Sequence, residues 1–145
     1  MLTKLFTYLK HEQQLLIQLV SLAEEQQQAL VKYNISRLEE VTRFQEEVAA
    51  SLRNAEEQRI NMLMNWLKIS RAKAIGLKLS AVEKYFKDEE LLEIRKLKVN
   101  LKKLLTTLKS VNSNNRILSN RAKRSVNEVL EIFTSGSRHV CNVTV

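Results

Sequence analysis

Proline is absent from the chain, and glycine occurs only at Gly76 and Gly136. These two residue types form most tight turns, so a sheet protein built from many hairpins is close to excluded. Phosphate-cradling loops and dinucleotide-binding turns also need clustered glycines, and the chain has none. A length of 145 residues with 44% hydrophobic side chains suffices for one domain with its own core. The sequence therefore predicts a single helical domain.

Three long segments carry apolar residues at alternating three- and four-residue spacings, the stripe of an amphipathic helix. Ser36 and Ser80 each open a capping-box pattern, and Gly76 is suited to end a helix. We expect helices over about residues 2–31, 36–75, 80–86 and 88–134. Helices this long pack as an elongated antiparallel bundle or coiled coil, so the predicted class is all-α. The predicted domain spans residues 1–136, and residues 137–145 form a C-terminal tail.

Candidate catalytic and metal-binding residues are few. Cys141 is the single cysteine, so it has no internal disulfide partner. His139 and Cys141 offer two metal ligands where a site needs three or four. We expect no enzyme activity, no metal and no cofactor.

No segment of the sequence matches a targeting or membrane-crossing pattern. The most apolar stretch, Leu15–Val20, is far shorter than the roughly 20 residues that a membrane-crossing helix requires. The first residues are interrupted by polar side chains such as Thr3 and Lys4, unlike the apolar region of a secretory signal. We therefore expect a cytoplasmic protein without membrane insertion.

Positive charge is concentrated in the second half of the chain. Residues 1–67 carry a net charge of −2 and residues 68–145 a net charge of +10, which together give +8. Ten cations and no acidic residue lie between positions 95 and 124. These ten residues, here called the basic stripe, are Arg95, Lys96, Lys98, Lys102, Lys103, Lys109, Arg116, Arg121, Lys123 and Arg124.

Three interpretations of the basic stripe remain open: a solvated helix face partly neutralised within the fold, a contact surface for an acidic protein, and a nucleic-acid site. If the second and third long helices pair antiparallel, Glu46 and Glu47 lie near Arg116. Exposed pairs of this kind stabilise by only about 0–1 kcal/mol each. Nucleic acid is the least favoured partner, because no aromatic residue for base stacking lies between Phe86 and Phe133.

A polar cluster, Asn112-Ser113-Asn114-Asn115, interrupts the third long segment. Asn115 falls on the apolar stripe itself. A polar residue at such a position costs stability and either sets the register of the helices or leaves a hydrogen-bonding group for a partner. Both alternatives are open.

Three segments combine into a broader pattern. A leading helix rich in Leu, Gln and Glu covers residues 15–30, and a polar break leads into a helix start over residues 34–40. After a long Glu-rich helix, an Asn-centred run precedes an aliphatic position over residues 111–118. This pattern, over about residues 5–133, resembles the FlgN family of flagellar export chaperones.

The resemblance implies a cytoplasmic, non-enzymatic chaperone that binds the C-terminal helices of the hook–filament junction proteins FlgK and FlgL. It also implies delivery of these clients to the flagellar export apparatus. For the oligomeric state, a monomer and a homodimer both remain open. The client-binding region of the family corresponds to the third helix. The residues expected to bind the client are Leu108, Val111, Asn112, Asn115, Leu118, Ala122, Val126, Val129, Leu130 and Phe133.

A separate physical argument supports part of this set. A third helix that extends past its neighbours leaves five apolar residues partly uncovered, namely Leu118, Val126, Val129, Leu130 and Phe133. Exposed apolar area of this kind usually marks an interface. Two alternative functions remain: a basic helical nucleic-acid-binding protein and a structural coiled-coil adaptor.

Overall fold

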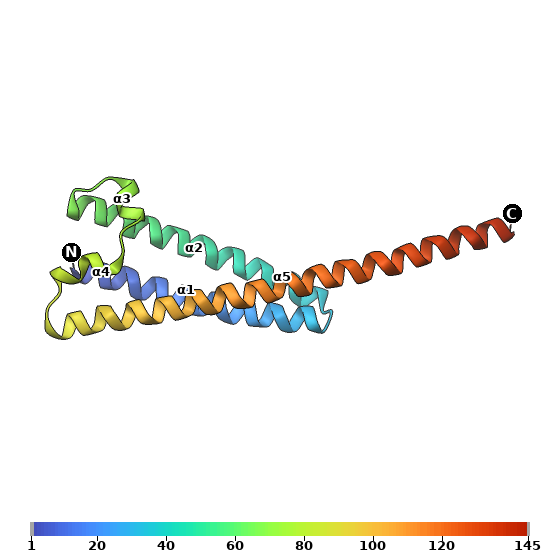
Figure 1. The fold of residues 1–145 in the computed structure, drawn as a ribbon, viewed down its shortest axis with the longest axis horizontal. Helices are drawn as coiled ribbons and strands as arrows, with labels where there is room; N and C mark the ends of the chain where they lie inside the picture. Colours follow the sequence, from blue (N-terminus) through green and yellow to red (C-terminus); the bar gives the residue numbers. More distant parts are fainter. Residues whose placement is uncertain (1, 145) are drawn as a thin grey trace.

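Helices account for every regular element in the computed structural model of the chain, over the residues that it describes. The described backbone covers residues 2–144, and the described side chains cover residues 2–135. The elements are α1 (Leu2–Val31), α2 (Ile35–Leu67), α3 (Arg71–Ile75), α4 (Leu79–Val82), the 3-10 helix η1 (Glu83–Tyr85) and α5 (Asp88–Thr144). The all-α prediction is confirmed, and the three long helices form an elongated bundle (Figure 1).

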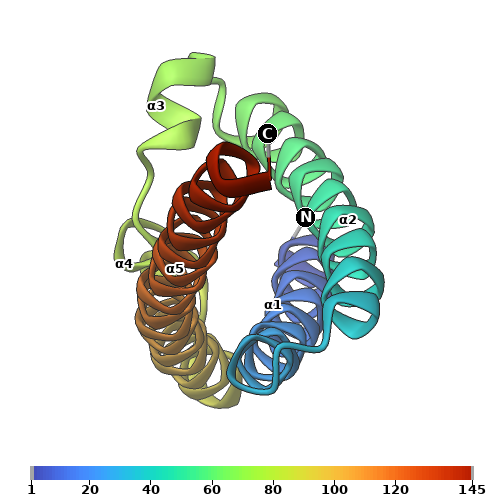
Figure 2. The ribbon, with the colours of Figure 1, turned by 90° about the vertical axis from the view of Figure 1, so that its right-hand side faces the viewer.

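α1 lies between the other two long helices. It packs along α2 on one side and along α5 on the other, whereas α2 and α5 hardly contact each other. α2 runs opposite to α1, and α5 returns in the direction of α1 (Figure 1). Seen from the end, α2 and α5 stand apart on either side of α1 (Figure 2). The predicted pairing of α2 with α5 was therefore wrong, because α1 provides the apolar surface for both.

The start of α2 differs from the predicted capping box. Tyr33 adopts a left-handed backbone conformation, with φ of 53°, and breaks the chain direction after α1. The side chain of Asn34 then caps α2 by accepting a hydrogen bond from the backbone N–H of Arg37 at 3.1 Å. Ser36 lies inside the helix. Asn34 takes the cap position because its side-chain oxygen reaches the amide three residues ahead, as an N-cap requires.

The end of α2 also differs from the prediction. The helix ends at Leu67, and Lys68 adopts the left-handed conformation that commonly follows a helix. Ser70 caps the short helix α3 through the backbone N–H of Lys73. Gly76, with φ of −82°, has no left-handed role. A single helix over residues 36–75 was therefore a wrong prediction, and the chain instead makes a bend that begins at Lys68.

The short helix predicted near residues 80–86 is present as α4 followed by η1, although no side chain caps α4 and Ser80 lies within it. α5 begins at Asp88 as expected and continues through Gly136 to Thr144, so the end predicted near residue 134 was wrong. Glycine costs about 1 kcal/mol in a helix relative to alanine, which weakens a helix without necessarily ending it. The predicted tail over residues 137–145 lies outside the described side chains.

The apolar core is concentrated at one end of the bundle. There the start of α1, the end of α2, the α3–α4 connection and the start of α5 come together. The buried residues of this core are Leu5, Leu9, Ile60, Met62, Leu63, Ala74, Val82, Phe86, Ile94 and Leu97. The rings of Phe6 and Phe86 meet edge to face, with centroids 5.1 Å apart. The connection after α2 therefore closes this end of the bundle, whereas a short turn between α1 and α2 lies at the other end.

Candidate functional site

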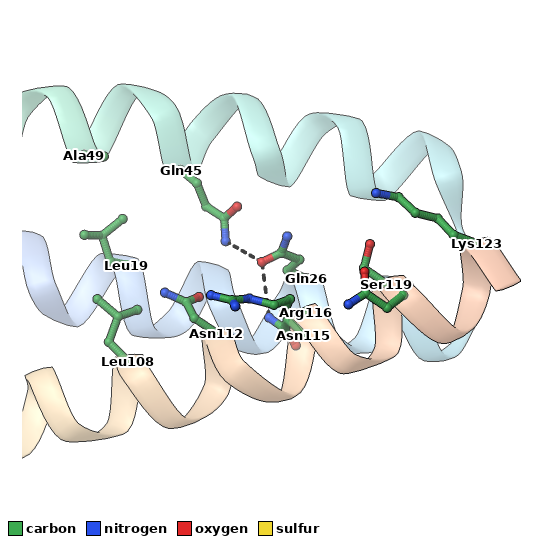
Figure 3. Close-up of a pocket in the computed structure, with 11 residues that line it drawn as sticks. Leu19, Gln26, Gln45, Ala49, Leu108, Asn112, Asn115, Arg116, Ser119 and Lys123 are labelled. Atoms are coloured by element: carbon green, nitrogen blue, oxygen red, sulfur yellow. Dashed lines mark hydrogen bonds between the residues drawn. The ribbon is translucent and has the colours of Figure 1, made fainter.

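The open end of the bundle contains two adjoining hollows between α5 and the other long helices. The first, here called the groove, has a volume of about 560 Å³. Its floor includes Leu19 of α1, and its walls include Ala49 of α2 and Leu108 of α5 (Figure 3). The second, here called the tip hollow, has a volume of about 450 Å³ and lies where α5 passes the turn between α1 and α2. Ser119 and Lys123 line both hollows, so the two form one continuous surface.

Side-chain amides from all three long helices meet beneath the groove. Asn115 of α5 donates from Nδ2 to the carbonyl oxygen of Ala23 at 2.8 Å and to Oε1 of Gln26 at 3.2 Å. Gln45 of α2 donates from Nε2 to the same Oε1 of Gln26 at 3.0 Å (Figure 3). This network links α2 to α5 through α1, at a level where Ala23 and Val41 are also buried.

The structure places Asn115 inside the bundle, with 4% of its surface exposed. Its Oδ1 atom is buried and makes no hydrogen bond within the described part of the chain. Its Nδ2 atom fixes α5 against α1, which is the behaviour of a register-setting polar residue in a helical seam. The register interpretation of Asn115 therefore fits the contacts on α1.

Apart from the buried Asn115, the predicted client-binding residues occupy three different environments along α5. Leu108, Val111, Leu118 and Ala122 are half-buried against the bundle, and Asn112 is exposed in the groove wall. Beyond the α1–α2 turn, α5 projects past the other helices (Figure 1). The residues exposed on this projecting part include Val126, Val129, Leu130 and Phe133. Val129 is 64% and Phe133 is 73% exposed, as the sequence argument expected.

The basic stripe is almost entirely exposed. Lys98 is half-buried and the other nine side chains are exposed. Among the described side chains, Arg95 is the one member in an ion pair, with Glu83 at 3.6 Å. The expected proximity of Glu46 and Glu47 to Arg116 gives no ion pair in the described part of the chain. Neutralisation of the stripe by α2 was therefore a wrong prediction, since α1 separates the two helices.

Arg116 and Lys123 are the members of the stripe that line the groove. Their side chains extend from α5 over the opening (Figure 3). The residues that line the groove and the tip hollow include no carboxylate. The electrostatic character of this surface is therefore positive.

A buried ion pair joins α1 to α2 beside the groove end of the core. Arg59 donates from Nε to both carboxylate oxygens of Glu12 at 3.0 Å. Glu12 is 4% exposed. Burial raises the pKa of Glu12 above its ordinary value, and the adjacent Arg59 guanidinium counteracts part of that rise. The pair is a structural contact between helices.

Sequence reasoning missed Glu12 and the joint role of Gln26 and Gln45. A signal was present, because Glu12 lies three residues after Leu9 and four before Leu16, on the buried stripe of α1. Arg59 interrupts the α2 stripe in the same way. Polar residues at stripe positions on two neighbouring helices are good candidates for mutual pairing across the interface.

Two further findings bear on function. Within the described residues, no three His, Cys, Asp or Glu side chains gather in a way that would hold a metal ion. His139 and Cys141 lie outside the described side chains. None of the described helices combines the length and hydropathy that a membrane crossing demands.

Comparison with known proteins identifies a family. A family model described as FlgN protein matches residues 1–144. No curated protein and no solved structure matches the chain. The family match covers the three long helices and both hollows.

Proposed function

The chain belongs to the FlgN family, and from this premise we propose that it is a cytoplasmic chaperone for the hook–filament junction proteins FlgK and FlgL. FlgN is a chaperone family rather than an enzyme family, and membership implies a role in flagellar protein export. The finer proposal is that the chain binds the C-terminal helices of these clients and prevents their premature assembly. It then presents them to the flagellar export apparatus.

One observation carries the proposal: the apolar stripe of α5 continues from the bundle onto the projecting part of the helix. Leu118 and Ala122 are half-buried against the bundle, whereas Val126, Val129 and Phe133 follow at the same spacing and are exposed. A stripe of this kind is complementary to the apolar face of a partner helix. A contiguous exposed apolar patch is also unusual on a protein that has no partner.

Burial of the exposed apolar side chains on the projecting part of α5 would contribute favourably to binding. Full burial of a large apolar side chain contributes about 1.5–3 kcal/mol. Several such side chains on the projecting part of α5 therefore offer several kcal/mol before the costs of association are subtracted. A client helix uses its apolar face to assemble with other subunits. When that face is bound to α5, it is covered and the client cannot assemble.

Isothermal titration with the purified C-terminal segments of FlgK and FlgL from the same genome tests the proposal. We expect Val129→Asp to weaken binding at least tenfold, because it places a charge in the centre of the apolar contact. Ile75→Asp in α3 is the matched control, since Ile75 is 58% exposed at the opposite end of the bundle. Absence of binding by the unmodified chain would contradict the proposed function.

A further inference from the structure

We propose that the groove between α2 and α5 receives one acidic amphipathic helix of the client, which lies against α1 as the fourth helix of the bundle. This inference rests on the proposed function and specifies the chemistry of the partner. It also adds residues of α1 and α2 to a contact that family resemblance assigned to α5 alone.

The arrangement of the helices leaves a position for a fourth one. α2 and α5 both pack on α1 and hardly contact each other, and the groove lies between them. At the near end the α3–α4 connection contributes Ala74 and Val82 to the core and fills the corresponding position. The groove lies further along the same helices, at Leu19, Ala49 and Leu108. A client helix would therefore complete the bundle at the level of the amide network.

The charge of the groove selects the partner. Arg116 and Lys123 line it and make no ion pair with the described side chains, and its lining includes no carboxylate. Lys109 and Arg121 are exposed on the same helix and add to the positive field. Complementary charge at a contact of this kind favours carboxylates on the partner and raises the rate of encounter.

The other residues that line the groove determine which contacts a partner helix can make. Leu19, Ala49 and Leu108 provide an apolar strip for one face of the helix. Asn112 and Asn120 line the same groove, and neither side chain makes a hydrogen bond within the described part of the chain. Each amide offers two donors and one acceptor to carboxylates or amides of the partner. The groove can therefore bury one apolar face of a partner helix and form hydrogen bonds with its polar side chains.

This lining favours a protein helix over the other occupants. A nucleic-acid site would be expected to offer aromatic rings for stacking, and the groove lining has none. A second copy of the chain would place its own α5 with the same cations against Arg116 and Lys123, which is repulsive. An acidic client helix satisfies both the cations and the apolar strip.

Charge reversal tests the inference with a matched control on the same helix. The groove variant is Arg116→Glu combined with Lys123→Glu, and the control is Lys102→Glu combined with Lys103→Glu, two exposed stripe residues that do not line the groove. Both change the net charge equally. At 150 mM salt we expect the groove variant to bind the FlgK and FlgL C-terminal segments at least tenfold more weakly, and the control less than threefold more weakly. Helicity and urea unfolding verify that both variants fold.

A covalent closure of the groove gives a second test. Ala49→Cys and Asn112→Cys, in a Cys141→Ser background, place one thiol on each wall of the groove. Bridging them with a short bismaleimide should abolish client binding, whereas the same reagent added to the Cys141→Ser chain without the two new cysteines should leave binding unchanged.

The outcomes separate the two proposals. If the unmodified chain binds neither segment, the proposed function fails. If it binds and both the groove variant and the bridged protein bind equally well, the client lies elsewhere and only the groove inference is overturned. If the unmodified chain binds a 20-base-pair DNA duplex tightly at 150 mM salt and the groove variant does not, nucleic acid is the occupant. A dimer of the free chain that the groove variant dissociates would identify a second copy, and either result overturns the inference.

Discussion

Replacing Arg59 by leucine removes the partner of a buried carboxylate. Glu12 is almost fully buried, and Arg59 donates to both of its oxygens at 3.0 Å. The loss of one partner from a buried ion pair costs about 3–5 kcal/mol, because the remaining charge stays in a poorly solvated place. We expect Arg59→Leu to lower the free energy of unfolding by about 3 kcal/mol at pH 7.5. Urea unfolding followed by circular dichroism at 222 nm measures this change.

The cost should depend on pH with a definite sign. Burial raises the pKa of Glu12 in the folded chain above its ordinary value of 4.5, and removal of Arg59 raises that pKa further. In the pH range just above 4.5 the folded state therefore binds a proton that the unfolded state releases. Lowering the pH through the folded pKa stabilises the folded state, so the deficit of Arg59→Leu should be smaller at pH 5 than at pH 7.5.

A double variant tests the same ion pair in a second way. Glu12→Leu with Arg59→Leu puts one apolar side chain between the buried Leu9 and Leu16 of α1 and another one turn after the buried Ala55 of α2. Replacement of a buried pair by apolar residues is often neutral or stabilising, so the double variant should be more stable than Arg59→Leu. A loss below 0.5 kcal/mol for Arg59→Leu, or a deficit equal at both pH values, would refute this account of the ion pair.

Four further predictions concern the bundle, its polar network and its partners. Asn115→Ala should lower the free energy of unfolding by about 1–2 kcal/mol through loss of its two hydrogen bonds, whereas Asn114→Ala at an exposed neighbouring position should stay within about 0.5 kcal/mol; urea unfolding measures both. Val129→Asp should leave the melting temperature nearly unchanged in differential scanning calorimetry, and a loss of several kcal/mol would show that Val129 packs in the bundle. The triple variant Lys102→Gln, Lys103→Gln and Lys109→Gln should keep most of its affinity for the client. Duplex DNA should bind the chain only weakly and dissociate near physiological salt. Tight, sequence-selective DNA binding at 150 mM salt would contradict the chaperone assignment. Far-UV circular dichroism should give a helix content more than twice the ~30–35% average of globular domains, and appreciable strand content would contradict the bundle.

The helical stripes were predictable from the sequence because apolar spacing reports directly on which face of a helix is buried. α1 was predicted with its observed bounds, since the stripe and the break near Tyr33 coincide. The bend after α2 was missed, because Lys68 adopts a left-handed conformation without glycine. Local sequence at that point resembles a continuing helix, and the tertiary contacts of α3 decide the outcome.

The order of the helices in space was harder to predict than their existence. Three apolar stripes are compatible with any one of the helices in the centre. α1 takes that place because its stripe is wide enough for two neighbours, with both Leu15 and Leu16 buried. The candidate site also has a predictable part and an unpredictable part. The exposure of the projecting end of α5 could be predicted from the length of the helix. The groove could not, because it depends on which helices pack against each other.

Hydrogen–deuterium exchange with and without client tests the central claim most directly. The account predicts that saturating FlgK or FlgL C-terminal segment slows amide exchange over residues 126–135 of α5 and around residues 45–49 of α2, while α3 and α4 stay unchanged. Contact of these segments with α5 and the groove would produce that pattern, because backbone opening there is suppressed by the bound helix. Protection confined to α3 and α4, or no change along α5 under saturating conditions, would contradict it.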